Sequence, residues 1–257
     1  MQQFRTYKEE GGVYECYSLM HKNQNVDFVY KKRSHYSQLN NRKMTIKEAL
    51  VHLDSFIDPS DPDLDMPNSV HAYQTAERIR KKYPENKELQ IVGLIHDLGK
   101  VLFSFSEPSW AVVGDTYVVG CKFPESIVYY DTLKDNPDFN KYDELGIYDE
   151  HCGLENLHLS YGHDEYLYQI LKQNDNKISE KYMNVIRYHS FYPWHTGGDY
   201  KQFMNETDHQ ILKDVLEFNE FDLYSKEDDT NITNEIKQYY DTILNEYFPN
   251  EILTGKL

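Results

Sequence analysis

Apolar residues recur at intervals of three and four along most of this chain, the spacing that places them on one face of an α-helix. In residues 45–56, for example, Ile46, Leu50 and Leu53 share such a face. The same periodicity predicts further helices over residues 69–82, 88–102, 160–173, 179–189, 207–224 and 231–247. The pattern therefore predicts an all-α protein.

One stretch departs from this periodicity. Residues from Trp110 to Cys121 are rich in valine and interrupted by glycine, which is typical of a short β-hairpin. No internal repeat and no linker rich in glycine, serine or proline divides the chain. We expect a single all-α domain over residues 1–257, with this hairpin as a small excursion.

The composition of the chain indicates which classes of partner it binds and in which compartment it is found. The formal net charge of −16 over 257 residues argues against nucleic acid, which basic clusters bind, and favours a small-molecule substrate. The chain has no long apolar run and no signal-like start, so we expect no membrane association. Its three cysteines stand at unrelated spacings, which fits a reducing, cytoplasmic location. We also expect a monomer.

The most informative motif of the sequence is the pair His96 and Asp97, which lies within the apolar stretch from Val92 to Lys100. A buried carboxylate is costly unless a cation or strong hydrogen-bond donors neutralise it. Histidine beside it adds a ligand that divalent transition metals accept. The pair therefore predicts a buried metal, provided that the chain supplies further ligands.

Other candidate ligands occupy positions where a core residue would be expected. They are His71, His163, His189 and Asp222, each on the apolar face of a predicted helix. For any one of these histidines alone, a hydrogen-bonded core imidazole is the commoner explanation. Asp222 alone would be a helix-end cap or a partner for a lysine. The case for a metal depends on the set as a whole.

The number of groups indicates the number of metals. One octahedral ion held by all of these side chains would have no open position for chemistry. Two ions share about twelve positions, of which four imidazoles, one terminal aspartate and one bridging aspartate fill about seven. Asp97 is the natural bridge, because His96 can bind one ion while the neighbouring carboxylate spans both. This mixed ligand set suits iron, with manganese and zinc as alternatives.

The order of these residues along the chain resembles that in the oxygenase branch of the HD-domain superfamily. The sequence motifs around them resemble those of the myo-inositol oxygenase family. The words that match run from Asn68 to Glu77, Val92 to Val101, Trp110 to Thr116, Gly162 to Tyr166, His189 to Gly197 and Phe218 to Tyr224. The similarity extends from about Phe4 to Phe248, nearly the whole chain.

The resemblance implies a helical HD-domain-like fold and a non-haem di-iron centre in a mixed-valent Fe(II)/Fe(III) state. Such enzymes use O2 to cleave the C1–C6 bond of myo-inositol, which gives D-glucuronate in inositol catabolism. The metal ligands that it implies are His71, His96, Asp97, His163, His189 and Asp222. Asp97 and Lys100 are then the catalytic residues, since a lysine ammonium would stabilise an alkoxide on the substrate.

The resemblance also implies a set of substrate contacts, which are Arg5, Asp58, Pro59, Ser60, Lys100, Gly114, Asp115, His189, Ser190 and Lys226. From the residues alone, several have simpler explanations. Lys100 could form an ordinary ion pair with Asp97 one helical turn earlier. Asp58 could lie in a solvated turn between helices, and Gly114 with Asp115 is a common turn signal.

The chain departs from the family pattern at three places. Its amino-terminal extension is short, Pro59 replaces the usual acidic residue, and Gly198 stands where the family often carries arginine. These departures concern the substrate side and remove none of the expected ligands.

Three alternatives remain open from the sequence. An HD-domain phosphohydrolase would use two metals to activate water, but it should bring several basic residues to the site, and only Lys100 lies beside the His-Asp pair. A related oxygenase that cuts a C–P or another C–C bond would share the metal ligands but would lack the sequence motifs that contact inositol. A non-catalytic metal-binding domain would bind metal without consuming O2.

Overall fold

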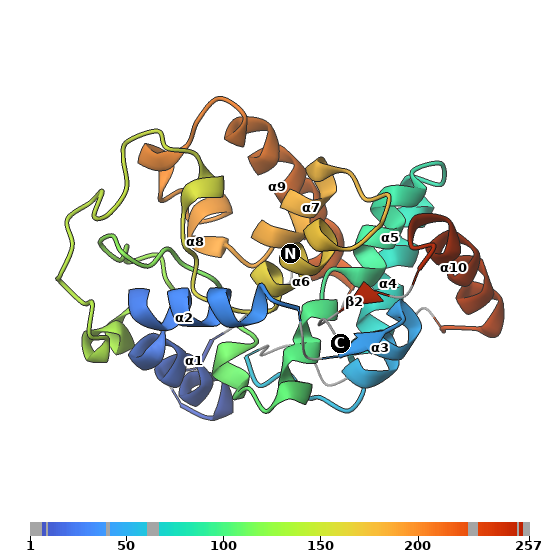
Figure 1. The fold of residues 1–257 in the computed structure, drawn as a ribbon, viewed down its shortest axis with the longest axis horizontal. Helices are drawn as coiled ribbons and strands as arrows, with labels where there is room; N and C mark the ends of the chain where they lie inside the picture. The colour runs from blue at the N-terminus through green and yellow to red at the C-terminus, as the bar shows by residue number, and fades with distance from the viewer. Residues whose placement is uncertain are drawn as a thin grey trace.

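The computed structural model describes residues 7–8, 10–39, 42–60, 67–225, 231–250 and 252–253, and its architecture is helical (Figure 1). The α-helices are α1 (Gly12–Asn23), α2 (Val26–Tyr36), α3 (Ile46–Leu53), α4 (Asn68–Lys82), α5 (Lys87–Ile95), α6 (His163–Gln173), α7 (Glu180–Tyr188), α8 (Tyr192–His195), α9 (Asp208–Ser225) and α10 (Asn234–Tyr247). The all-α prediction is confirmed. The periodicity located most of these helices but not α1, α2 or the short α8.

Short 3₁₀ helices connect the longer ones, and strand structure is minimal. The 3₁₀ helices are η1 (Leu98–Phe105), η2 (Ser109–Ala111), η3 (Tyr130–Asp135), η4 (Leu154–Asn156) and η5 (Lys201–Phe203). Among the described residues, β1 (Lys43–Met44) pairs antiparallel with β2 (Ile252–Leu253), which joins segments from the two ends of the chain.

The hairpin expected between Trp110 and Cys121 is wrong. The segment begins with η2 and continues as extended chain whose backbone bonds go to distant segments rather than to itself. Thr116 donates its N–H to the carbonyl of Ser190, and Val119 donates to that of His158. The valines are apolar because the segment is buried on all sides, a composition that cannot be distinguished from a strand by pattern alone.

The helix expected over residues 88–102 is also interrupted. Helix α5 ends at Ile95, His96 and Asp97 form the turn that follows, and the tighter η1 helix begins at Leu98. On a continuous α-helix neighbouring side chains point about 100° apart. At the turn where the helix type changes, both side chains instead reach the same cluster, with His96 Nε2 3.5 Å from Asp97 Oδ2 and 3.4 Å from Asp222 Oδ1.

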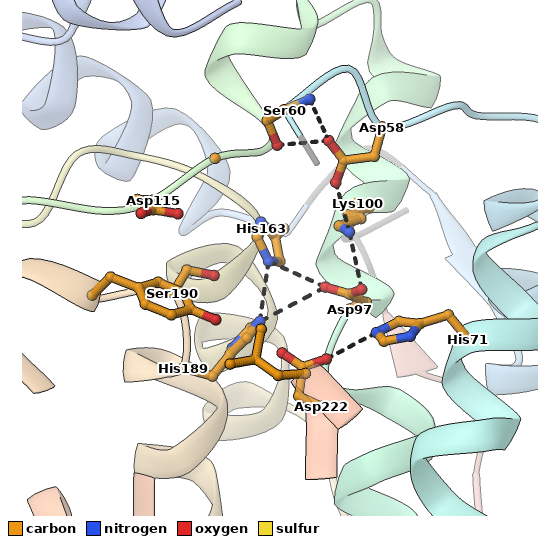
Figure 2. A pocket seen from close by; sticks show the side chains of 13 residues that line it. Asp58, Ser60, His71, Asp97, Lys100, Asp115, His163, His189, Ser190 and Asp222 are labelled. Atoms are coloured by element: carbon orange, nitrogen blue, oxygen red, sulfur yellow. Dashed lines mark hydrogen bonds and ion pairs between the residues drawn. The ribbon is translucent and has the colours of Figure 1, made fainter. Parts of the chain in front are cut away.

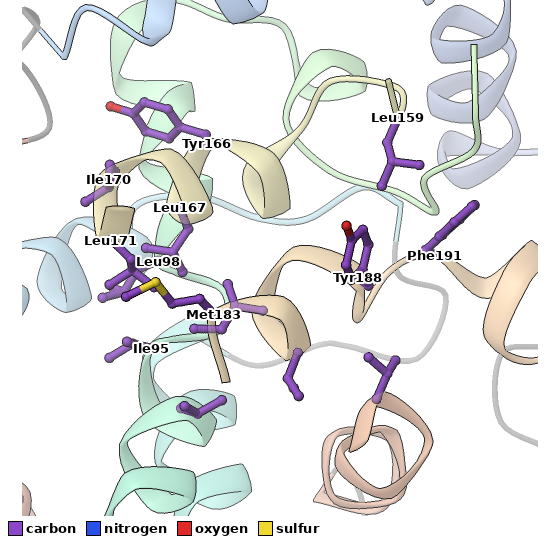
Figure 3. Close-up of a cluster of buried hydrophobic side chains, with 14 of the residues drawn as sticks. Ile95, Leu98, Leu159, Tyr166, Leu167, Ile170, Leu171, Met183, Tyr188 and Phe191 are labelled. Carbon is purple, nitrogen blue, oxygen red and sulfur yellow. The ribbon is translucent and has the colours of Figure 1, made fainter. Parts of the chain in front are cut away.

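The core lies between the helices that carry the candidate ligands. Helix α4 packs along α5, and α6 packs against both η1 and α7, while α9 contacts α4 and α7 (Figure 1). Figure 3 shows the apolar part of this packing, where Ile95, Leu98, Leu167 and Met183 meet between α5, α6 and α7. This apolar cluster therefore fixes the relative positions of the helix ends that form the site.

No helix within the described residues is both long and apolar enough to span a bilayer.

Helix α3 begins with a capping box, which supports a stability prediction. The Thr45 hydroxyl accepts the N–H of Glu48 at 3.1 Å, and the Glu48 carboxylate accepts the N–H of Thr45 at 2.7 Å. We expect Thr45→Ala to lower the free energy of unfolding by about 1 kcal/mol, because it leaves a helix N–H without its acceptor. Urea denaturation measures this. Thr45→Ser, which keeps the hydroxyl, is the control, and an equal loss in both variants would contradict the role of the cap.

Candidate metal centre

The structure brings all of the sequence-predicted ligands to one place, and Figure 2 shows all of them except His96. His71 comes from the first turns of α4, His96 and Asp97 from the turn between α5 and η1, and His163 from the first turn of α6. His189 follows the last turn of α7, and Asp222 lies near the end of α9. Several of these donors therefore come from helix ends, where a side chain can project into the space between helices.

Asp97 lies at the middle of the cluster and its two oxygens face different groups. Its Oδ1 is 3.3 Å from His163 Nε2 and 3.7 Å from His189 Nε2. Its Oδ2 is 3.5 Å from His96 Nε2 and accepts a hydrogen bond from Lys100 Nζ at 2.9 Å. The carboxylate therefore separates two groups of imidazoles, as a bridging ligand would.

Asp222 completes the side of the cluster formed by His71 and His96. Its Oδ1 lies 2.9 Å from His71 Nε2 and 3.4 Å from His96 Nε2. This aspartate therefore faces imidazoles, as the metal hypothesis expects.

Backbone contacts hold three of the imidazoles in one orientation. The Nδ1 atoms of His96, His163 and His189 lie 2.8, 2.9 and 2.7 Å from the carbonyl oxygens of Gly93, Val112 and Ile186. A carbonyl accepts a hydrogen bond only, so Nδ1 must carry the proton in each ring. The Nε2 atoms therefore point inward toward the carboxylates, and each is the nitrogen that would bind a metal once deprotonated, the arrangement that metal-binding histidines commonly show.

The electrostatics of the cluster favours ionised carboxylates. Burial alone would raise the pKa of Asp97, but the nearby charges of Lys100 and His96 and hydrogen bonds from His163 and His189 hold that pKa well below its usual range. For Asp222, burial is likewise outweighed by His71 and His96, so its pKa also lies well below the ordinary value. Both side chains are therefore available as anionic ligands.

The donor set fits metal ions. Among the described residues, two groups have ligand atoms close enough together to hold an ion, namely His71 with His96 and Asp97, and Asp97 with His163 and His189. Asp97 belongs to both groups. Imidazole nitrogens and carboxylate oxygens without any thiolate suit iron, manganese and zinc. The chemistry of the residues thus matches a pair of adjacent cations that share one aspartate.

A polar pocket of about 490 Å³, its open mouth included, lies over this cluster. Besides the candidate ligands except His96, its lining residues are Asp58, Ser60, Lys100, Gly114, Asp115, Ser190, Tyr192 and Leu223. Most of the expected substrate contacts therefore line a single cavity.

Lys100 connects the pocket to the cluster. Its Nζ lies 2.8 Å from Asp58 Oδ2 and 2.9 Å from Asp97 Oδ2, and the side chains of all three are about 6 % exposed. Burial would lower the pKa of Lys100, but the charges of Asp58 and Asp97 raise it above the ordinary value, so the ammonium form persists. The simple ion pair with Asp97 thus exists, within a larger buried bridge.

Asp58 is not in a solvated turn. Its Oδ1 accepts the N–H of Ser60 at 2.9 Å and the hydroxyl of Ser60 at 2.6 Å, while its Oδ2 points to Lys100. Ser60 is only 5 % exposed. The turn is folded inward over the pocket, which corrects the alternative drawn from the sequence.

Asp115 is held by a tyrosine of α1. The Tyr17 hydroxyl donates to Asp115 Oδ1 at 3.0 Å and accepts the N–H of Asp115 at 3.0 Å. The preceding Gly114 has a φ of +103°, and a Cβ there would overlap the Met20 side chain. Glycine is therefore favoured at this position chiefly by its φ, which other residues rarely adopt, since the methyl end of Met20 can move.

Some of the expected substrate contacts do not line the pocket or lie outside the described residues, and two residues that were not expected line it. Pro59 lies between two lining residues without lining the pocket itself, and Arg5 and Lys226 lie outside the described residues. Tyr192 and Leu223 line the pocket but were not expected. Both are neighbours of quoted motif residues, yet nothing in their own pattern distinguishes them from core positions.

Fold and site together define a helical protein with a buried histidine–aspartate centre beneath a polar pocket. The family model described as "Myo-inositol oxygenase" matches residues 10–254, and this chain belongs to that family.

Curated relatives agree with this membership. The chain is 50 % identical over 244 residues to the inositol oxygenase of Mus musculus, which covers 93 % of this chain and 86 % of the relative. It is 48 % identical over 241 residues to that of Homo sapiens, with 92 % and 85 % covered. Inositol oxygenase 1 of Arabidopsis thaliana is 47 % identical over 259 residues, with 97 % and 83 % covered.

Close packing of η1 against α6 yields a prediction. A Cβ at Gly99 would overlap the carbonyl of His163, so Gly99→Ala must push the two segments apart. We expect the free energy of unfolding to fall by about 1–3 kcal/mol, as for overpacked cores. Chemical denaturation measures this change. The control is Gly12→Ala in α1, where the added methyl meets nothing within 4 Å; a loss no larger than in this control would contradict the packing argument.

Proposed function

We propose that this chain is an iron-dependent oxygenase that opens the ring of myo-inositol. The reaction consumes one O2 and breaks the C1–C6 bond, giving D-glucuronate and water, a four-electron oxidation of the substrate. The observation that carries this proposal is the position of Asp97, shared by two groups of side chains that could each hold a metal ion, beneath a pocket lined with carboxylate and hydroxyl groups.

We propose His71, His96, Asp97 and Asp222 as the ligands of one ion, and Asp97, His163 and His189 as those of the other. Open positions remain on both ions in this allocation. When bound, a mixed-valent Fe(II)/Fe(III) pair supplies coordination of O2 and of substrate hydroxyls together with the redox chemistry. The role of the protein is to hold that pair and to place the polyol against it.

The pocket supplies groups that suit a neutral polyol. Asp58, Asp115 and Ser190 present oxygen atoms that can accept hydrogen bonds from hydroxyl groups, and all of them line the same cavity. Tyr17 fixes Asp115 and Ser60 fixes Asp58, so these acceptors are preorganised. We propose that they orient the ring with its C1–C6 edge toward the cluster.

Lys100 is proposed as a catalytic residue. Its buried ammonium can stabilise negative charge on a substrate oxygen, since such interactions are strong where water is excluded. The same ammonium is balanced by Asp58 and Asp97, which keeps it in place before substrate binds.

A phosphohydrolase receives no support. Lys100 is the only lysine or arginine among the described residues that line the pocket, and two carboxylates already neutralise it. A phosphate ester would instead meet the carboxylates of Asp58 and Asp115. The related oxygenase and the non-catalytic metal-binding domain are separated from this proposal by product analysis.

We further propose that the chain forms one domain, acts as a monomer in the cytoplasm and binds no nucleic acid. The net charge of −16 supports the last point. The free cysteines Cys16, Cys121 and Cys152 are consistent with a reducing compartment. The possible contributions of Arg5, Pro59 and Lys226 to substrate binding belong to the proposal as well.

The decisive assay uses the purified protein loaded with iron under reducing conditions and supplied with myo-inositol. We expect O2 uptake and glucuronate formation in a one-to-one ratio, because each ring opening consumes one O2. A phosphate ester is offered in parallel. Phosphate release without O2 uptake would sink the oxygenase proposal, and metal binding without either reaction would indicate a non-catalytic domain.

A pair of substitutions separates metal binding from catalysis. We expect Asp97→Ala to lower the metal content from two ions per chain to one or none, because it removes the shared ligand. Lys100→Ala should retain both ions but lower kcat by about 10²–10³-fold, the usual loss of a charge-stabilising group. Elemental analysis and steady-state kinetics measure these effects.

The matched control is Lys122→Ala, which breaks only the exposed pair with Glu144. It should leave metal content and kcat unchanged. A Lys100→Ala protein without metal would contradict the catalytic role of Lys100 and place that lysine among the groups that build the centre.

A further inference from the structure

The helix residue after His163 makes contacts that its place in the sequence does not require. Asp164 is the second residue of α6, where an acidic side chain is commonly exposed and favours the helix dipole. Here it is 1 % exposed, and its contacts go to the segment that follows α7. Burying a carboxylate is costly, so these contacts call for an explanation beyond helix stability.

One oxygen of Asp164 serves two side chains. Its Oδ1 lies 2.9 Å from His189 Nδ1 and accepts a hydrogen bond from the Ser190 hydroxyl at 3.0 Å. The same oxygen is 3.4 Å from His163 Nε2. His189 and Ser190 are both among the residues that line the pocket (Figure 2), so this oxygen contacts two lining side chains although Asp164 itself is not one of the lining residues.

This arrangement singles out one imidazole of the cluster. The Nδ1 atoms of His96 and His163 each contact a backbone carbonyl, whereas that of His189 contacts both the Ile186 carbonyl and the Asp164 carboxylate. A carboxylate partner fixes ring orientation and raises the basicity of the ligand nitrogen more than a carbonyl does. Of these three rings, His189 is thus the one whose Nδ1 atom has a carboxylate partner.

We infer that Asp164 is a positioning residue that sets, through a single carboxylate oxygen, both the imidazole of His189 and the hydroxyl of Ser190. The inference rests on the proposed function, in which His189 binds a metal and Ser190 contacts the polyol. Asp164 would therefore couple metal binding to substrate binding, because a substitution at Asp164 disturbs one proposed metal ligand and one proposed substrate contact together.

The first test measures metal affinity without turnover. Asp164→Asn keeps the shape of the side chain and removes its charge. In competition with a chelator, using Mn²⁺ alone, we expect the affinity for one of the two ions to fall about 10- to 100-fold and the affinity for the other to stay unchanged. Only one ion is affected because Asp164 contacts none of His71, His96 and Asp222 in the described interactions.

The matched control is the adjacent Glu165→Gln. Glu165 is also buried in α6, but its carboxylate pairs with Arg187 at 2.8 Å and with Arg33 at 3.2 Å. This variant should lose stability and keep both metal affinities. Equal effects of Asp164→Asn and Glu165→Gln on metal binding would reduce Asp164 to a structural role and overturn the inference. Loss of one ion as complete as in His189→Ala would make Asp164 a ligand, which would also overturn it.

The second test concerns Ser190. If Asp164 orients this hydroxyl, Ser190→Ala and Asp164→Asn should each raise the KM for myo-inositol. The double variant should raise the KM by a smaller factor than the product of the two single-variant factors. Ser190→Ala alone should leave the Mn²⁺ affinities unchanged. Multiplicative effects on KM would show that the two residues act independently and would overturn the coupling.

A measurement on the unmodified protein covers the case in which Asp164→Asn does not fold. In protein loaded with Zn²⁺, the Nδ1 proton of His189 should exchange slowly with solvent and resonate downfield of those of His96 and His163. Equivalent signals from all three rings would overturn the inference. If the unmodified protein forms no glucuronate while these metal-binding results hold, the proposed function fails and the positioning role stands.

Discussion

Burial of the Asp97 carboxylate is the constraint on which the rest of this structure depends. An ionised carboxylate that is 4 % exposed must be surrounded by positive charge or hydrogen-bond donors. Imidazoles approach both of its oxygens, and the ammonium of Lys100 approaches one of them. Cations between the carboxylate and the imidazoles would complete this neutralisation, so one physical requirement accounts for both the ligand cluster and the lysine.

Helix ends meet this requirement because they allow side chains to converge. His96 and Asp97 lie in the turn where the α-helix gives way to a 3₁₀ helix, His163 begins α6 and His189 follows α7. The apolar contacts between α5, α6 and α7 fix these ends, so the packing of the core determines the geometry of the centre.

Charged side chains connect the pocket with the candidate metal centre. The bridge from Asp58 through Lys100 to Asp97 links the loop over the cavity with the bottom of the site. Asp164 makes a comparable link on the opposite side, between His189 and Ser190. The proposed substrate contacts and the proposed ligands thus share their supporting charges.

The sequence by itself determined the helical class and the candidate ligands, because helical periodicity and a polar residue on an apolar face are local properties. It could not determine that the α-helix ends before His96 and Asp97, where η1 packs against α6 and Gly99 lies close to the carbonyl of His163, because these contacts join segments far apart in the chain. The hairpin expected near Val118 was wrong because burial on all sides and strand pairing select the same valine-rich composition. The roles of Tyr17 and Asp164 were decided only by tertiary structure, because their hydrogen bonds join residues far apart in the chain.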